Sequence, residues 1–232
     1  MSDTTTPTKH YLLWIDVETT AIKPEDGQLL EVGMRITNLD GSEVAPQTVN
    51  APYAFSTIIP HARLDYTPAT ERAFKMHQEN GLLSMVFWYK NQLSIGTWLL
   101  DCIDKLQDNN GPHAILHPAG TNVDFDLEWL KDKQAPLFFT PIWESNVSYR
   151  KLDMSTIRLT LTAVGIDPYQ ANHKTTHRVD DCLDRDIHDY MSYIEWVKTH
   201  EEFSEASLDP DEMADFPVGD SLHERFESED DE

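Results

Sequence analysis

Long apolar runs, cysteines and basic residues are all scarce in this chain of 232 residues. No run of about 18 apolar residues occurs, so we expect no membrane span. The opening residues, MSDTTTPTKH, lack the apolar core of a signal peptide, which leads us to expect a cytoplasmic protein. The two cysteines, Cys102 and Cys182, cannot build a disulfide framework and lie too far apart for a structural zinc motif, so we expect buried thiols.

Basic residues number 18 against 41 acidic ones, which gives a formal net charge of −23. A chain this acidic is not expected to bind nucleic acid unaided. Residues 201–232 hold 14 acids and one base, Arg225, and so carry −13 of the total. We expect this tail to be disordered, either as a solubilising segment or as one that binds a partner. The predicted organisation is a flexible N-terminus (1–9), one domain (10–200) and the tail (201–232).

Apolar patterns separate strands from helices along the domain. HYLLWID (10–16) suits a buried strand whose end emerges at a functional edge, and further strands are predicted at 28–41, 42–51 and 113–116. Helices are predicted at 67–81, 93–107, 125–133, 153–165 and 180–200, the last with Cys182, Ile187 and Tyr190 on its inner face. Strands followed by alternating helices and strands indicate an α/β or α+β domain.

Acidic residues stand at unusual places in these elements. Asp16 and Glu18 lie two apart on a strand, so both carboxylates face one side, where they repel each other unless a cation lies between them. Glu31 interrupts the apolar run LLEVGM and can reach the same site if its strand pairs with the first. Asp126 begins a helix, where the dipole favours a carboxylate. Oxygen ligands of this kind suit Mg²⁺, and a fourth could come from residues 180–186.

Several segments resemble the DEDD superfamily of 3′–5′ exonucleases, namely WIDVETTAIKP, LLEVG, GTNVDFDLEWL and the His–Asp stretch near the end. More narrowly, residues 11–38, MHQENGL (76–82) and YRKLDMSTIRL (149–159) are similar to oligoribonucleases, which belong to its histidine branch (DEDDh). The similarity runs in order over about residues 10–200. It implies a ribonuclease-H-like α/β fold, in which a mixed five-stranded sheet with three antiparallel first strands is flanked by helices.

The resemblance also assigns site residues. The family's metal-binding acids match Asp16, Glu18, Asp126 and Asp181, and its general base matches His177.

Three more positions match substrate contacts of the family. Ile22 falls where an apolar residue is wedged against a base, and Tyr149 and Arg150 match a pair near the substrate. Because that tyrosine serves the neighbouring subunit's active site in the family, the resemblance implies a homodimer.

The spacing around the base departs from the histidine branch, which leaves four residues between the histidine and the last aspartate. His177 and Asp181 leave three. The histidine spacing leads instead to Cys182, which is no ligand for hard metals, and counting back from Asp181 in the same way gives Thr176, which cannot act as a base at neutral pH. We therefore infer a contraction of one residue before the last helix.

Other residues of this stretch keep alternative roles. Asp180 competes with Asp181 as a ligand, and His173 is a distant alternative base. Asp184 and Asp186 are expected on the solvated surface of the helix. Asp180 is expected there too if it does not bind metal.

The resemblance implies hydrolysis of short single-stranded RNA from the 3′ end to 5′-mononucleotides. Two divalent cations, Mg²⁺ or Mn²⁺, would hold the scissile phosphate, with Asp16 bridging them, while His177 takes a proton from the attacking water. These cations would supply the positive field that the chain lacks. DVETT replaces the usual oligoribonuclease pattern, so single-stranded DNA stays open as the substrate. A competing hypothesis is a non-catalytic exonuclease-fold protein that binds a partner through its acidic tail.

Overall fold

The computed structural model describes residues 8–44, 53–90, 94–107, 112–134, 141–168 and 175–199. The chain divides into two compact units, Met1–Met191 and Ser192–Glu232. The described part of the second unit, residues 192–199, contains a stacked ring pair, Tyr193 and Trp196, with centroids 6.4 Å apart. The tail 201–232 and His173 lie outside the described residues.

One five-stranded sheet in the order β3-β2-β1-β4-β5 forms the centre of this unit. The strands β1 and β2 are antiparallel, as are β2 and β3, whereas β4 runs parallel to both β1 and β5. This arrangement confirms the predicted mixed sheet and ribonuclease-H-like fold class. The strands span β1 (Thr8–Thr19), β2 (Leu29–Asn38), β3 (Ala54–Ile58), β4 (His113–Gly120) and β5 (Leu152–Asp153).

The third strand lies later in the chain than predicted. Residues 42–51 were expected to form it, but β3 begins at Ala54. Of the predicted stretch, residues 42–44 are described, and there Glu43 makes an isolated bridge to Thr37. The other residues of the predicted strand, 45–51, lie outside the described residues.

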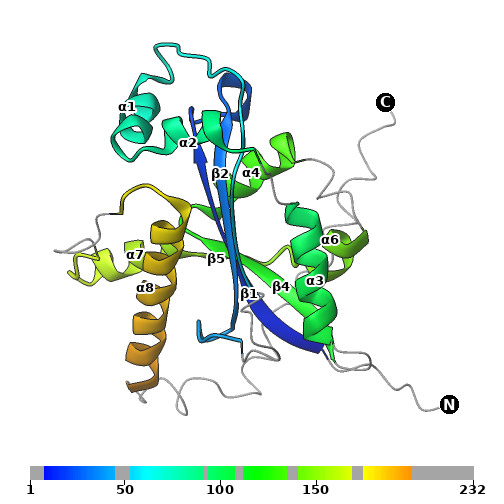
Figure 1. Ribbon diagram of the computed structural model, residues 1–232. Helices are drawn as coiled ribbons and strands as arrows, with labels where there is room; N and C mark the ends of the chain where they lie inside the picture. Colours follow the sequence, from blue (N-terminus) through cyan, green and yellow to red (C-terminus); the bar gives the residue numbers. More distant parts are fainter. Residues whose placement is uncertain are drawn as a thin grey trace, which may run out of the picture. The chain divides into compact units, whose positions relative to one another are not determined.

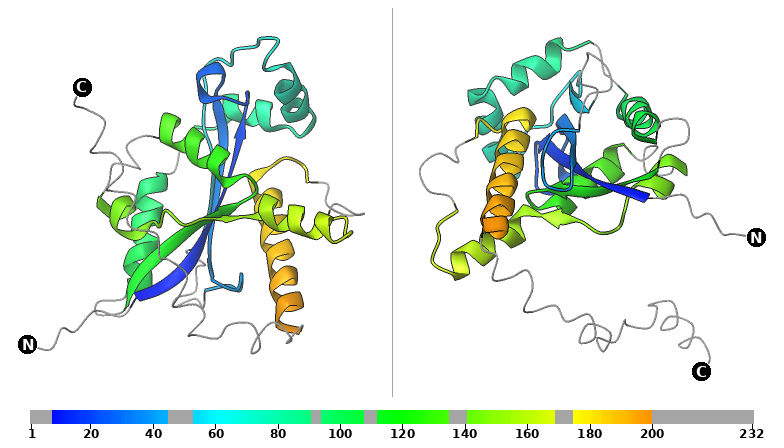
Figure 2. Two further views of the ribbon diagram at one scale, coloured as in Figure 1. Left: turned by 180° about the vertical axis from the view of Figure 1, so that it is seen from behind. Right: turned by 90° about the horizontal axis from the view of Figure 1, so that it is seen from below.

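Seven α-helices are described around the sheet, and none in the described ranges is both long and apolar enough to cross a membrane. Figures 1 and 2 show α3 on one side of the sheet and α8 on the other, with α1 and α2 beside the end of β1 and the start of β2. The helices are α1 (Glu71–Glu79), α2 (Leu82–Trp88), α3 (Ile95–Gln107), α4 (Val123–Lys133), α6 (Pro141–Asn146), α7 (Met154–Ala163) and α8 (Val179–Thr199), with the short 3-10 helix η1 at Pro24–Asp26.

The alternation of side chains along β1 sorts the core from the site. Leu13, Ile15 and Val17 belong to the main apolar cluster, which also contains the inner face of α3. The opposite face carries Trp14, whose ring contacts the edge of Tyr190 on α8 at a centroid distance of 5.6 Å. Since side chains alternate along a strand, Asp16 and Glu18 lie on this second face. The same alternation that buries the core therefore turns both carboxylates toward α8.

Candidate metal and catalytic site

Three acids from two elements meet at the end of β1. Asp16 and Glu18 come from β1, and Asp126 comes from the first turn of α4. The Val17 amide donates a hydrogen bond of 3.0 Å to Asp126 Oδ1, which ties α4 to β1 between the other two acids. Close approach of the chain is possible because Gly120 has no side chain, since a Cβ there would lie 2.7 Å from the Ile15 carbonyl oxygen. The structure thus brings together three of the four predicted metal-binding acids.

Burial makes these carboxylates unfavourable as free anions. Glu18 and Asp126 are 6% and 3% exposed. Burial, then the charges of Asp126 and Glu18, raises the pKa of Asp16 well above its usual value. Burial likewise raises the pKa of Asp126, and burial together with Glu31 raises that of Glu18 to about 8. Among the described residues, the buried Asp16 Oδ2 has no hydrogen-bond partner. Hard oxygen donors with an unsatisfied buried atom fit a divalent cation.

His77 is a buried neighbour of this group that the sequence patterns did not single out. Its side chain is 0% exposed, and its Nε2 lies 3.0 Å from the Thr19 carbonyl oxygen and 3.7 Å from Glu18 Oε2. Burial is the main cause that lowers the pKa of His77 to about 4, with smaller contributions from His177 and Arg178. A neutral His77 donates to Thr19 and adds no positive charge to the site.

Glu31 is cross-strand from Glu18, as its place in the sequence suggested, but its charge is already compensated. Arg178 donates to both of its carboxylate oxygens, at 2.8 and 2.6 Å. This ion pair joins β2 to the residue just before α8, so Glu31 anchors the start of that helix.

The predicted base and fourth ligand lie on the segment that enters α8. His177 is exposed with a φ of 52°, and its carbonyl oxygen accepts a hydrogen bond of 2.7 Å from Asn80. Asp181 is exposed, and its carboxylate accepts a hydrogen bond from the Thr176 hydroxyl. Asp180, the competing ligand, is exposed and forms an ion pair with Arg35 on β2.

Cys182 lies beside two of the acids, Asp16 and Glu18. Oxygens of Asp16 and Glu18 and the sulfur of Cys182 all lie within 4.8 Å of one another, and among the described residues this is the group of three that could hold a metal ion. The thiol is 6% exposed, and burial followed by the charge of Asp16 raises its pKa. The four-residue spacing from His177 was the sequence signal for this position.

Asp186 was expected on the solvated surface, and that expectation was wrong. It is 3% exposed, because Arg158 on α7 donates to its Oδ1 at 2.8 Å and forms a buried ion pair. Arg185 also donates to Oδ1, and the Thr121 hydroxyl donates to Oδ2 at 2.7 Å. Its charge contributes to the raised pKa values of Asp16 and Asp126.

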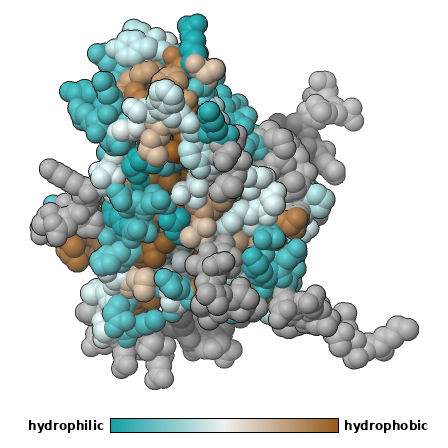
Figure 3. All heavy atoms as spheres, in the orientation of Figure 1, coloured by the Kyte–Doolittle hydropathy of each residue, from teal (hydrophilic) through white to brown (hydrophobic). Residues whose placement is uncertain are grey.

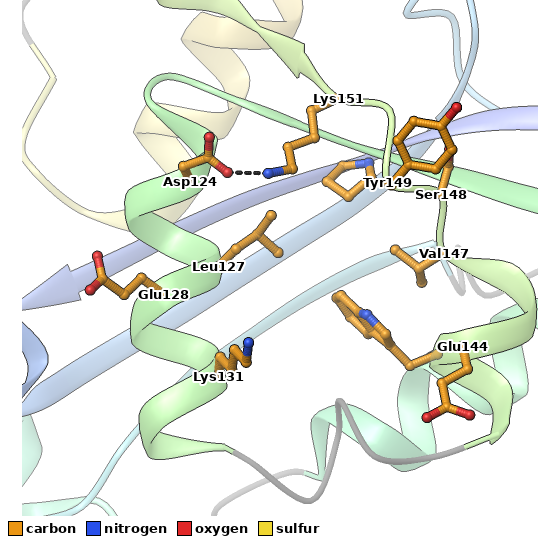
Figure 4. Close-up of a pocket in the computed structure, with 11 residues that line it drawn as sticks. Asp124, Leu127, Glu128, Lys131, Glu144, Val147, Ser148, Tyr149 and Lys151 are labelled. Carbon is orange, nitrogen blue, oxygen red and sulfur yellow. Dashed lines mark hydrogen bonds and ion pairs between the residues drawn. The ribbon is translucent and has the colours of Figure 1, made fainter. Parts of the chain in front are cut away.

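The three predicted substrate contacts are exposed residues. Ile22 is 83% exposed, while Trp129 Nε1 donates to its carbonyl oxygen at 3.3 Å, so an anchored backbone presents a free apolar side chain. Tyr149 is 82% exposed at a hollow of about 630 Å³ between α4 and the segment from α6 to β5 (Figure 4). The Arg150 guanidinium lies 5.6 Å from the Tyr149 ring centroid.

Comparisons with known proteins agree with this geometry. No family model matches the chain. An oligoribonuclease of Actinobacillus pleuropneumoniae serotype 5b is 25% identical over 190 residues, which cover 82% of this chain and 92% of that protein. An oligoribonuclease of Baumannia cicadellinicola is 28% identical over 149 residues, covering 64% of the chain and 72% of the relative.

The fold is also found in a solved exonuclease I from Methylocaldum szegediense. The TM-score is 0.52 at 14% identity, over 83% of this chain and 42% of that one. The chain therefore spans less than half the length of that solved exonuclease.

Proposed function

We propose that this chain, which belongs to the DEDD exonuclease superfamily, hydrolyses short single-stranded RNA from the 3′ end and releases 5′-mononucleotides. The observation that supports this most directly is the group of Asp16, Glu18 and Asp126, in which Glu18 and Asp126 are buried and the buried Asp16 Oδ2 has no hydrogen-bond partner among the described residues. Similarity to oligoribonucleases over most of the chain supports RNA of short length as the substrate.

Two divalent cations, Mg²⁺ or Mn²⁺, fit the proposed chemistry. When bound, they would supply Lewis acidity for the phosphodiester and a water of lowered pKa. The three buried acids would hold them at the end of β1. Asp181 is the fourth acid by resemblance, and one of its carboxylate oxygens accepts a hydrogen bond from the Thr176 hydroxyl.

His177 is the proposed general base, because a neutral imidazole nitrogen can take a proton from water. Asn80 and the Arg178–Glu31 ion pair hold the backbone on either side of it. The exposed Ile22 side chain would pack against the terminal base of the substrate.

We further propose a homodimer in which Tyr149 and Arg150 serve the partner's site. Both side chains are exposed, and Tyr149 lines the hollow between α4 and the segment from α6 to β5, which supports a role toward another molecule. Hydrophobic residues are also exposed on and just after α7, namely Leu159, Val164 and Ile166 at 71%, 70% and 47%. Figure 3 shows a hydrophobic patch at the left, where Figure 1 places α7. Light scattering on the purified chain tests this proposal.

The test of the activity is a length series of 5′-labelled di- to heptanucleotides, as RNA and as DNA, with Mg²⁺ or Mn²⁺. We expect shortening of RNA, fastest for the shortest oligomers. Asp126→Asn should abolish it, whereas Asp124→Asn, an exposed acid two residues earlier on α4, should retain it. Shortening of DNA alone would reassign the substrate. No shortening with either metal at excess enzyme would refute the proposal and favour a non-catalytic binding protein.

A further inference from the structure

Cys182 lies on α8, at the side of the acidic group that this helix covers. Its sulfur belongs with oxygens of Asp16 and Glu18 to a cluster in which all ligand atoms lie within 4.8 Å. A lone buried cysteine is usually a small apolar residue. Here the second observation is the neighbouring Asp16 Oδ2, a buried oxygen without a hydrogen-bond partner in the described part of the chain.

The position of Cys182 is set by the way α8 rests on the sheet. Gly33 lies opposite Asp16 on β2, and a Cβ at Gly33 would come within 2.7 Å of Val179 and 2.8 Å of Leu183. These two residues of α8 lie three before and one after Cys182, so their tight contact with the sheet holds the thiol beside the carboxylates. The Arg178–Glu31 ion pair fixes the same end of the helix.

The two neighbouring acids of α8 have other partners. Asp186 is engaged at both oxygens, by Arg158 and Arg185 at Oδ1 and by Thr121 at Oδ2. Asp181 faces Thr176 at the exposed surface.

We propose that Cys182 is a metal ligand, so that the site is completed by one sulfur beside the carboxylates and prefers thiophilic divalent cations over Mg²⁺. The inference rests on the proposed cation site of the nuclease and adds which ions it selects. Binding forms a metal–sulfur bond, and the thiol proton passes to solvent. Because thiolates favour softer ions and Mg²⁺ favours oxygen, Mn²⁺ should replace Mg²⁺ readily, and Co²⁺ or Cd²⁺ should bind more tightly still.

The direct test is an anaerobic titration of the full, reduced chain with Co²⁺, monitored by absorption in the near ultraviolet. A cobalt–thiolate bond gives an intense charge-transfer band that oxygen ligands do not give. We expect the band in the wild type, in Cys102→Ala and in Asp181→Asn, and its loss in Cys182→Ser. Circular dichroism establishes that each variant is folded.

A second measurement keeps the inference testable if Cys182→Ser is unstable. Competition between Cd²⁺ and Mg²⁺ should favour Cd²⁺ in the wild type, and Cys182→Asp should shift that preference toward Mg²⁺ by about tenfold or more.

Co²⁺ binding by calorimetry without the band, or a band that survives Cys182→Ser, would overturn the role of the thiol. Oligonucleotide shortening by the same samples separates the two proposals. Activity without the band would contradict only the proposal that Cys182 is a metal ligand. A band without activity would support the cation site and contradict the proposed nuclease function.

Discussion

At the residue scale, the sequence was informative where a charge interrupts a local pattern. Asp16 and Glu18 were recognisable because a strand places residues two apart on one face, and Asp126 because it begins a helix. The burial of Asp186 could not be recognised in the sequence, because its partner Arg158 lies on α7, 28 residues earlier. Pairing between distant elements leaves no periodic signal, so an acidic helix face and a buried ion pair look alike in sequence.

The raised pKa of Glu18 predicts a pH dependence of stability in the metal-free protein. With a folded pKa of about 8 against an ordinary 4.5, folding favours the protonated acid. Its contribution is complete below pH 4.5 and is lost as pH rises through 8. The free energy of unfolding in EDTA should therefore fall by up to about 1.4 kcal/mol per pH unit more in the wild type than in Glu18→Gln. Urea unfolding between these pH values measures the difference, and equal slopes would contradict it.

The buried ion pair of Asp186 predicts a stability loss. Asp186→Ala leaves the Arg158 guanidinium with Asp189 as its remaining carboxylate partner among the ion pairs described. The free energy of unfolding should fall by about 3 kcal/mol, the lower end for a broken buried pair. Asp184→Ala, at an exposed position on the same helix, should change it by less than about 0.5 kcal/mol. Equal small effects in urea unfolding would argue against the pair.

At the element scale, long patterned elements were predictable and short ones were not. The helices α3 and α7 and the strand β2 fall within their predicted ranges, α8 begins one residue before its range, and β1 extends beyond its range at both ends. α2, α6 and the two-residue β5 were missed, because a few residues show no full period. The contact of α8 with β2 depends on Gly33, whose role is visible only once Val179 and Leu183 lie against it.

Adding a methyl group at Gly33 tests this contact. Gly33→Ala should push α8 from the sheet and lower the free energy of unfolding by about 1–3 kcal/mol. Val179→Ala should restore part of the loss, because it removes the Val179 Cγ2 atom, which the new methyl would otherwise meet at 2.8 Å. A double-mutant cycle by urea unfolding gives the coupling, and strictly additive effects would show that the two residues do not compete for space.

At the scale of the whole molecule, the net charge of −23 opposes the binding of a polyanion such as RNA. The proposed divalent cations would supply the positive charge that the site needs. The fold class was predicted from the resemblance over residues 10–200, because the order and spacing of motifs reflect the order of strands and helices in a fold. Composition alone separated the acidic tail from the domain but assigned it no role.

Removing residues 201–232 separates the roles of domain and tail. The deletion takes away −13 of the charge and leaves the acids at β1 and α4 in place. Nuclease activity per molecule should stay within about twofold of the full chain at matched ionic strength, because screening confines distant charges. Loss of activity on deletion, with the circular dichroism spectrum kept, would place the tail in the function.

The most direct measurement compares one RNA heptanucleotide labelled at its 5′ or its 3′ end, with excess enzyme and Mn²⁺. A 3′–5′ exonuclease should give a descending ladder from the 5′-labelled strand and a labelled mononucleotide at once from the 3′-labelled strand. Asp126→Asn should give neither product. Early mononucleotide from the 5′ label, internal fragments from both, or equal products from Asp126→Asn would contradict a metal-dependent exonuclease built on Asp16, Glu18 and Asp126.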